Sequence, residues 1–428
     1  MKIYLLLLTA TTVLSAAAQN YDSYFTGNTT DVSTLPQGGI CLMGGATEED
    51  EAMKWFLNRA DGGDVLVLRA SGADGYNDYM YNQLGVTVNS VETIVFNDAS
   101  ASNEAYIQQK VSKAEAIWFA GGDQWNYITY WQGNAIESAI NQAIGNGAVV
   151  GGTSAGMAIL GGFRFTAENG TITSASALAN PYDNNATIGS TPFIASGNFL
   201  EHTITDTHYD NPDRKGRHVT FLARILQDSG ITAKGIACDE YTAVCIDENG
   251  MARVYGQYPT YDDNAYFILP NCELADPSPE TCTAGNPLTW NHNGAALKVY
   301  AVKGTLAGTN TFDLSDWQTG AGGEWQDWSV VNGVLNEASG IAPDCSASLE
   351  EAEISLNILP NPAREFIQIE SSEKFYSACI FSVSGKQAQA VSDVTNYINI
   401  SSLSEGAYWL EVNLENGSAL REKFVVLR

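Results

Sequence analysis

The stretch that predicts the fold of the larger part of the chain is Ala148-Val149-Val150-Gly151-Gly152-Thr153-Ser154-Ala155-Gly156-Met157-Ala158-Ile159-Leu160. A short apolar run leads into a corner of small residues, after which a helix is expected. The corner fits G-x-S-x-G, a pattern that places a serine on a sharp strand-to-helix turn with its hydroxyl clear of the sheet. The glycines let the two backbones pass closely, where a Cβ would clash. Ser154 is therefore a candidate nucleophile, although such corners also occur without chemistry.

The chain before this corner alternates expected strands with expected helices. The strands are expected at 39–43, 64–69, 91–97, 116–120 and 148–151, and the helices at 47–60, 77–84, 101–113, 123–131 and 135–144. This alternation predicts an α/β fold whose parallel sheet is covered by helices on both faces. Ligands of such sheets bind beyond the carboxyl ends of the strands. Gly44-Gly45, Gly121-Gly122 and Ser154 are expected at that edge.

The chain after the corner divides into further segments. Residues 161–200 are an insertion that could wall one side of the site. A strand at 203–206, a helix at 214–228, a strand at 235–239 and a hairpin over 242–255 are expected next, and residues 256–343 are rich in strands and turns. From 354 onward, short alternating strands predict a small β-sandwich.

The ends and the overall charge exclude several classes of protein. Residues 1–18 have the charged start, apolar stretch and small-residue end of a signal peptide, so the mature chain is expected to start at Gln19. No later apolar run is long enough to span a membrane. The net charge of −28 argues against binding nucleic acid or an anionic membrane. The expected division is a signal peptide (1–18), a polar leader (19–37), an enzyme domain (38–343), a linker (344–353) and a sandwich (354–428).

The seven cysteines suit an exported protein, in which disulfides are permitted. Cys272 and Cys282 flank a polar loop and are expected to pair. Cys41, Cys238 and Cys245 lie in apolar strand patterns and are expected to be small core residues. No zinc-binding motif is present, and neither a metal nor another cofactor is expected.

A nucleophilic serine needs a base and an orienting acid. Of the four histidines, His208 follows the carboxyl end of a predicted strand and is favoured over His202. His218 is expected to be a surface or half-buried helix residue, and His292 a solvated loop residue.

Glu240 ends a predicted strand at the same edge and is the favoured acid over the alternatives Asp206 and Asp239. Strand alternation turns Asp239 away from the side of Glu240. The resulting order of serine, histidine and acid differs from that of α/β-hydrolases.

Several motifs in order resemble the cyanophycinase-like serine peptidases, the family that includes aspartyl dipeptidase E. The matching segments are Gly44-Gly45-Ala46, Phe119–Gln124, Gly152–Gly156, Asp206–Tyr209, Arg214–Arg217 and Gly235–Ala243. The resemblance implies a class-I glutamine-amidotransferase-like α/β fold and hydrolysis of aspartyl or β-aspartyl peptide bonds.

The family's functional residues are carried over by motif. Ser154 is similar to the family's nucleophile, His208 to its general base and acid, and Glu240 to the residue that orients the histidine. Backbone N–H groups of Gly122 and Ala155 would form the oxyanion hole. The implied substrate-binding residues are Gln124, Asp206, Arg214 and Arg217.

Two positions depart from the cyanophycinase pattern. Cyanophycinases usually have glutamine where this chain has Thr207, and an arginine where it has Pro212. Both departures put cyanophycin itself in question as the substrate, but neither touches the implied triad.

The C-terminal segment resembles a type A sorting domain of the type IX secretion system. The matching stretches are Leu359-Pro360-Asn361-Pro362, Phe381–Lys386, Ile400–Tyr408 and the terminal strand from Lys423. The resemblance implies export across the outer membrane by that machinery, and a secreted or cell-surface location.

The favoured interpretation is a secreted serine peptidase acting on peptides with aspartyl or β-aspartyl residues. Two alternatives stay open: an esterase or amidase using the same triad, and a catalytically silent surface binding protein. Whether the chain forms a homodimer also stays open.

Overall fold

The computed structural model describes residues 19–191, 193–194, 199–345, 356–371, 375–382, 387–391, 397–414 and 419–428. The expected signal peptide and the linker residues 346–353 lie outside these ranges. The chain divides into two compact units, Met1–Cys345 and Ser346–Arg428. Each unit has its own apolar core and is described by itself.

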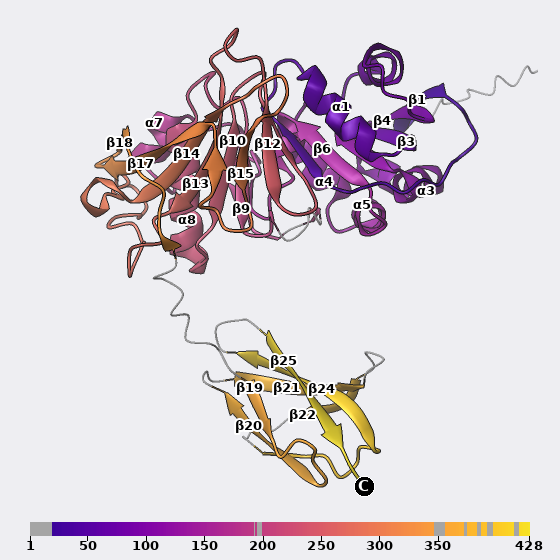
Figure 1. Cartoon of the computed structure of the whole chain (residues 1–428), viewed down its shortest axis with the longest axis vertical. Helices are drawn as coiled ribbons and strands as arrows, with labels where there is room; N and C mark the ends of the chain where they lie inside the picture. Colours follow the sequence, from indigo (N-terminus) through magenta and orange to yellow (C-terminus); the bar gives the residue numbers. More distant parts are fainter. Residues whose placement is uncertain are drawn as a thin grey trace, which may run out of the picture. The chain divides into compact units, whose positions relative to one another are not determined.

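The first unit is built on a ten-stranded sheet whose centre is parallel (Figure 1). The parallel strands, in spatial order, are β4 (Ser90–Phe96), β3 (Asp64–Arg69), β5 (Ala116–Phe119), β6 (Val149–Thr153) and β2 (Ile40–Met43). The strand–helix alternation predicted these five strands, and they are present. Their nearly continuous burial is typical of parallel strands covered on both faces.

Antiparallel strands extend this sheet at both edges, so it is mixed rather than purely parallel. The strand β1 (Tyr21–Gly27) pairs with β4, which corrects the prediction of an irregular leader over 19–37. At the other edge lie β11 (Ala243–Ile246), β12 (Met251–Tyr255), β15 (Asn310–Asp313) and β16 (Gly320–Ala321). The predicted hairpin of β11 and β12 is present, and it adds to β2.

Helices cover both faces of the parallel strands (Figure 1). The helix α1 (Asp50–Arg59) packs on one face, where Phe56 meets Trp118 edge-on at 5.2 Å between ring centroids. The helices α3 (Ala105–Lys113), α4 (Gln124–Trp131) and α5 (Ala135–Gly145) pack on the other. There Phe119, the next residue of β5, meets Trp131 of α4 at 5.7 Å. Successive strand residues thus point to opposite helix layers. The helix expected at 77–84 is a short α2 (Gly75–Asp78) and a π-helical turn, η1 (Tyr79–Gln83); a 3₁₀ turn, η2 (Ala99–Asn103), precedes α3.

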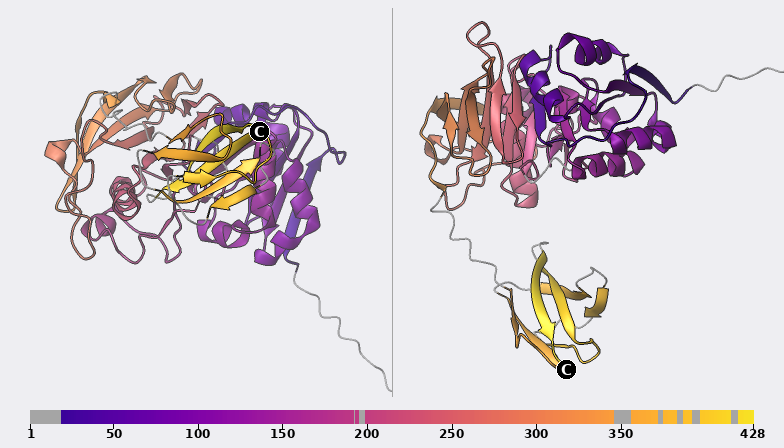
Figure 2. Two further views of the ribbon diagram at one scale, coloured as in Figure 1. Left: turned by 90° about the horizontal axis from the view of Figure 1, so that it is seen from below. Right: turned by 45° about the vertical axis from the view of Figure 1, so that its right-hand side comes forward.

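A second, six-stranded sheet lies beside the first in the same unit (Figure 2). Its strands in spatial order are β18 (Val334–Ser339), β17 (Gly323–Val331), β14 (Leu297–Lys303), β13 (Asn264–Pro270), β10 (Lys234–Cys238) and β9 (Thr203–Asp206). One face packs on α8 (Lys215–Ser229), and the other shares a core with the first sheet, for example through Phe267 of β13 and Phe312 of β15, stacked at 4.3 Å.

The insertion at 161–200 carries three short elements. These are β7 (Arg164–Phe165), α7 (Ser174–Ala179) and β8 (Ile188–Gly189), and β7 pairs with β8. Residues of this insertion belong to the same apolar core as α8, so the insertion is anchored to the second sheet's helix.

The second unit is the predicted β-sandwich. One sheet contains β19 (Leu356–Leu359), β20 (Phe366–Ser371) and β23 (Tyr397–Asn399); the other contains β22 (Gln387–Val391), β21 (Phe375–Ser382), β24 (Gly406–Leu414) and β25 (Ala419–Val426). Buried side chains from both sheets form a single core. The strand β22 was missing from the sequence prediction.

The cysteines differ in part from the prediction. The disulfide joins Cys272 to Cys345, not to Cys282. Cys282 is instead buried in the apolar core that contains the side chains of α8. As predicted, Cys41, Cys238 and Cys245 are fully buried in strands.

Candidate active site

The G-x-S-x-G corner has the geometry that its glycines predict. Ser154 links β6 to the single turn α6 (Ala155–Ala158) with φ 53° and ψ −117°, a strained conformation for a residue with a side chain. A Cβ on Gly152 would lie 2.5 Å from the backbone of Gly156. A Cβ on Gly156 would lie 2.0 Å from the carbonyl oxygen of Phe119. Both positions therefore require glycine.

The turn after β5 lies beside the serine. An added Cβ on Gly121 would be 3.6 Å from the Ser154 Cβ. Gly122 has φ 157°, and its position is limited by the Tyr127 hydroxyl, which donates to the carbonyl oxygens of Ala120 and Gly121. The two sequence-predicted oxyanion donors, Gly122 and Ala155, thus belong to the two turns that meet at Ser154.

A hydrogen-bonded chain joins Ser154, His208 and Glu240. The His208 Nε2 lies 2.9 Å from the Ser154 Oγ, and the His208 Nδ1 lies 2.6 Å from a carboxylate oxygen of Glu240. The parallel strands β9 and β10 align Asp206 with Ala237, so the residues that follow both strands emerge at the same edge. The sequence predicted this convergence, but in the structure it takes place between two sheets, because β9 and β10 belong to the second one.

The backbone of the β2 turn connects the two sheets at this point. The His208 N–H donates to the Gly44 carbonyl at 2.8 Å, and the Ser154 N–H donates to the Met43 carbonyl at 3.1 Å. A Cβ on Gly45 would lie 2.4 Å from the His208 imidazole. The Gly44-Gly45 turn therefore lies directly against the histidine ring, and His208 itself has a positive φ of 47°.

Glu240 is held from both its backbone and its side chain. Its N–H donates to Asp210 at 2.9 Å, and its second carboxylate oxygen accepts from the Asn211 amide at 3.3 Å. Burial opposes ionisation, but the hydrogen bonds from His208 and Asn211 outweigh it and lower the pKa of Glu240. Glu240 is therefore an anion at neutral pH, suited to orient an imidazole.

Two of the implied substrate-binding residues contact each other. Asp206 and Arg217 form a buried ion pair in which two guanidinium nitrogens donate to the two carboxylate oxygens, one of them at 2.8 Å. Burial raises the pKa of Asp206, but the Arg217 guanidinium outweighs that effect and lowers it. Sequence reasoning missed this pairing, because residues eleven apart on a strand and a helix have no fixed spatial relation.

The other two implied binding residues keep part of their polar surface. The guanidinium of the half-buried Arg214 donates one hydrogen bond within the described residues, from Nη1 to the Thr207 carbonyl at 2.9 Å. Gln124, the first residue of α4, donates to the Phe165 carbonyl at 3.4 Å. Since Phe165 lies in β7, the insertion does border this side of the site, as expected.

The alternative residues are placed elsewhere. His202 is exposed, and its backbone accepts from the Lys234 N–H. Asp239 contacts β13 instead, with one carboxylate oxygen accepting from the Asn264 N–H at 2.8 Å. His218 is fully buried under the second sheet, not near the surface as predicted, and its Nε2 donates to the Ile204 carbonyl. His292 donates to the Ser278 carbonyl through Nε2 at 2.8 Å.

Sequence reasoning also missed the residues that contact Glu240. Asp210 and Asn211 follow His208 by two and three residues, and both contact Glu240. Their polar side chains so close to the histidine could have suggested that they contact its acidic partner. Nothing in the sequence indicated which of their atoms would reach Glu240.

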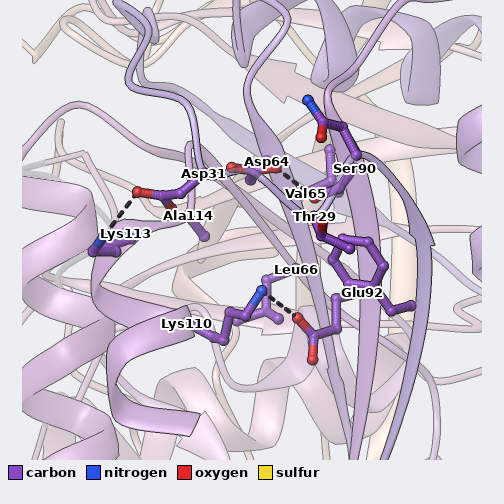
Figure 3. A pocket seen from close by; sticks show the side chains of 12 residues that line it. Thr29, Asp31, Asp64, Val65, Leu66, Ser90, Glu92, Lys110, Lys113 and Ala114 are labelled. Carbon is purple, nitrogen blue, oxygen red and sulfur yellow. Dashed lines mark hydrogen bonds and ion pairs between the residues drawn. The ribbon is translucent and has the colours of Figure 1, made fainter. Parts of the chain in front are cut away.

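A separate small cavity lies at the opposite edge of the parallel sheet (Figure 3). Its volume of about 20 Å³ suits one water molecule. Two ion pairs border it, Asp31–Lys113 at 2.8 Å and Glu92–Lys110 at 2.9 Å. Since the starts of β3 and β4 line this cavity, it is not part of the candidate active site, which lies at the carboxyl ends of the strands.

Within the described ranges, no group of three or more His, Cys, Asp or Glu side chains is arranged to hold a metal ion. In the same part of the chain, no helix is both long and apolar enough to cross a membrane.

Comparisons with known proteins agree with both parts of the sequence interpretation. Residues 42–254 match the model of Peptidase family S51, and residues 357–427 match the model of the secretion system C-terminal sorting domain. No curated protein matches the chain.

Three solved structures are similar to parts of the chain. One is a peptidase from an acI-B1 Actinobacterium, at 15% identity and a TM-score of 0.39, covering 52% of this chain and 89% of that one. Another is a putative peptidase E protein from Listeria monocytogenes EGD-e, at 16% identity and a TM-score of 0.33, covering 51% and 98%. The third is PorZ, a surface component of the type-IX secretion system of Porphyromonas gingivalis, at 12% identity and a TM-score of 0.16, covering 43% and 30%.

Proposed function

We propose that this secreted peptidase hydrolyses aspartyl or β-aspartyl peptide bonds through Ser154, His208 and Glu240. The match of residues 42–254 to Peptidase family S51 supports the peptidase activity, and the match of residues 357–427 to a secretion system sorting domain supports the export. The observation that carries this proposal is the continuous hydrogen-bonded chain from the Ser154 hydroxyl through His208 to Glu240. Such a chain is the arrangement that converts a weakly nucleophilic hydroxyl into an attacking group.

In the first step, the Ser154 Oγ attacks the peptide carbonyl while the His208 Nε2 accepts its proton. The ionised Glu240 accepts the Nδ1–H of His208, which keeps Nε2 free to act as the base and stabilises the imidazolium that forms. Asp210 and Asn211 are positioning residues in this scheme, because they hold the carboxylate of Glu240.

The tetrahedral intermediate carries its negative charge on the former carbonyl oxygen. The N–H groups of Gly122 and Ala155, from the two turns beside Ser154, would donate hydrogen bonds to that oxygen. His208 then returns its proton to the leaving amine, and a water molecule activated by His208 releases the acyl group from Ser154.

The preference for an acidic residue is assigned to Arg214. An aspartyl carboxylate is recognised best by a guanidinium with free donors. The guanidinium of Arg217 donates to Asp206, Thr171 and Ile172, so it supports the site from within the fold. The guanidinium of Arg214 donates a single hydrogen bond within the described residues, to the Thr207 carbonyl. Gln124, bordering the insertion, is the proposed neutral contact to the same substrate.

The experiment that tests this function is a panel of synthetic dipeptides and tripeptides analysed by mass spectrometry. The panel contains α-aspartyl, β-aspartyl and asparaginyl members, together with a p-nitrophenyl ester, and is incubated with the full chain and with Ser154→Ala. Cleavage of aspartyl members by the wild type alone supports the proposal. Hydrolysis of the ester alone would show that the enzyme is an esterase and not a peptidase. Equal cleavage by wild type and Ser154→Ala would show that Ser154 is not the nucleophile.

A further inference from the structure

Two buried cysteines face each other across neighbouring strands of the first sheet. Cys41 in β2 and Cys245 in β11 are directly opposed in the antiparallel register. Both have no exposed surface, and their sulfur atoms lie 3.6 Å apart. The two residues are separated by 204 positions in sequence, so the fold alone brings them together.

The hydrogen-bond pattern of these strands places the two cysteines at a close pair. The Gly44 N–H donates to the Thr242 carbonyl, and the register makes these two residues directly opposed. Opposed residues of an antiparallel pair alternate between hydrogen-bonded and non-hydrogen-bonded positions. Gly44 and Thr242 are a hydrogen-bonded pair, and Cys41 and Cys245 lie three positions further along the two strands. Because three is an odd number of steps, they are a non-hydrogen-bonded pair, whose Cα atoms are expected about 4.5 Å apart. This separation is within the range of about 4.4–6.8 Å that a disulfide spans.

The compartments that the exported chain crosses are oxidising enough for a disulfide to form. The sorting domain directs the chain out of the cell, and disulfides persist in the compartments that such proteins cross. The same chain already closes a disulfide between Cys272 and Cys345.

We propose that Cys41 and Cys245 are oxidised to a second, buried disulfide in the exported protein. The S–S bond forms as both thiols lose their protons, and the two electrons pass to a disulfide of a protein or small-molecule oxidant, whose own S–S bond breaks to give two thiols. The two sulfur atoms must approach from 3.6 Å to about 2.05 Å.

The burial of the pair fixes when this bond forms. A thiolate is the attacking species in disulfide exchange, and burial raises the pKa of the Cys245 thiol well above its ordinary value. An oxidant also has no access to residues without exposed surface. The bond therefore forms during folding, before β11 has paired fully with β2, and it resists reduction once the folded sheet excludes reductants.

The crosslink would join two strands that lead into the candidate active site. The strand β2 runs into Gly44, whose carbonyl accepts the His208 N–H. The strand β11 follows Glu240 by three residues. A bond between them fixes the distance between the turns that hold the histidine and the acid, whatever substrate the enzyme cleaves.

The test is a disulfide map of the full chain produced in an oxidising periplasm. The protein is denatured without reductant, its free thiols are alkylated, and its proteolytic peptides are identified by mass spectrometry. We expect one linked pair of peptides containing Cys41 and Cys245, besides the Cys272–Cys345 pair, and alkylation of the remaining three cysteines. Alkylation of both Cys41 and Cys245 would overturn the proposal.

Cys238 is the natural competitor, because its sulfur lies 3.8 Å from the Leu42 carbonyl oxygen beside the pair. The matched control is Cys238→Ala, which should leave the Cys41–Cys245 link unchanged. A link between Cys41 and Cys238 in the wild type would also overturn the proposal. The second measurement uses the variant Cys272→Ala/Cys345→Ala, in which the proposed bond is the one disulfide expected. The variant refolded with reductant should have a lower melting temperature than the variant refolded without it. Equal melting temperatures would count against the proposal.

Discussion

The buried carboxyl group of Asp239 should make the stability of the first unit depend on pH. Asp239 is 3% exposed, and burial raises its pKa to about 7 from the ordinary 3.8. One carboxylate oxygen accepts from the Asn264 N–H and side-chain amide, and the other has no hydrogen-bond partner within the described residues. The folded state therefore favours the neutral acid, because an anion there would have one oxygen buried without a partner.

The sign and size of the effect follow from linkage. Between pH 3.8 and about pH 7, the folded state binds the proton of Asp239 and the unfolded chain does not, so this group's contribution to stability falls as the pH rises. Above about pH 7 both states are ionised, and the loss is complete. A difference of roughly 3 pKa units at 1.36 kcal/mol each gives an upper bound of about 4 kcal/mol. Asp239→Asn stays neutral and escapes this loss.

The assay is urea unfolding of wild type and Asp239→Asn at pH 4 and pH 8, followed by tryptophan fluorescence. Eight of the nine tryptophans precede residue 346, so the signal reports mainly on the first unit. The variant should match the wild type at pH 4 and exceed its free energy of unfolding by up to about 4 kcal/mol at pH 8. Asp263→Asn, where burial and Asp210 also raise the pKa, should change in the same direction by less, because Asp263 is more exposed. An identical difference between Asp239→Asn and wild type at both pH values would show that ionisation of Asp239 does not change the stability.

Three further predictions concern the site. Glu240→Gln should reduce kcat by about 10²–10⁴-fold with a small change in KM, because the amide no longer selects the tautomer of His208. Both constants are measured on the aspartyl peptide that the wild type cleaves fastest. Gly45→Ala should reduce kcat at least about tenfold without touching the triad, because the new Cβ would lie 2.4 Å from the His208 imidazole and the position has φ 118°; a wild-type rate would contradict that geometry. Arg214→Met should lower kcat/KM for aspartyl peptides by about 10–100-fold and leave kcat/KM for asparaginyl peptides unchanged. Arg217→Met should instead lower the free energy of unfolding by about 3–5 kcal/mol, measured by thermal unfolding, because it leaves Asp206 buried without its partner. Equal behaviour of the two arginine variants would argue against their separate assignments.

Local sequence signals predicted the elements that form the candidate active site. The apolar run and small residues around Ser154 predicted β6 and its corner, since only glycine fits at Gly152 and Gly156. His208 and Glu240 could be placed together because each follows the carboxyl end of a strand, and the two strands are parallel neighbours. These inferences depend on short-range patterns and on one general rule for α/β sheets.

Features that depend on non-local pairing could not be predicted. The polar stretch containing β1 has no strong strand pattern, and it becomes a strand only because β4 offers an unpaired edge. The same limit explains the wrong partner for Cys272, since Cys345 lies 73 positions further along the chain and only the folding of the intervening residues brings it close. His218 reads as a helix-surface residue until a second sheet covers that face of α8.

In the proposed mechanism, Ser154 carries the acyl group during turnover. The most direct measurement is acid quenching of the wild type and Glu240→Gln with an aspartyl peptide, followed by mass spectrometry of the peptide that contains Ser154. We expect an added acyl mass on Ser154 and no turnover by Ser154→Ala. The fraction of Ser154 that carries the acyl group should be higher in the variant if its deacylation is slowed. Turnover with no adduct on that peptide, together with wild-type rates for Ser154→Ala, would contradict the proposed mechanism.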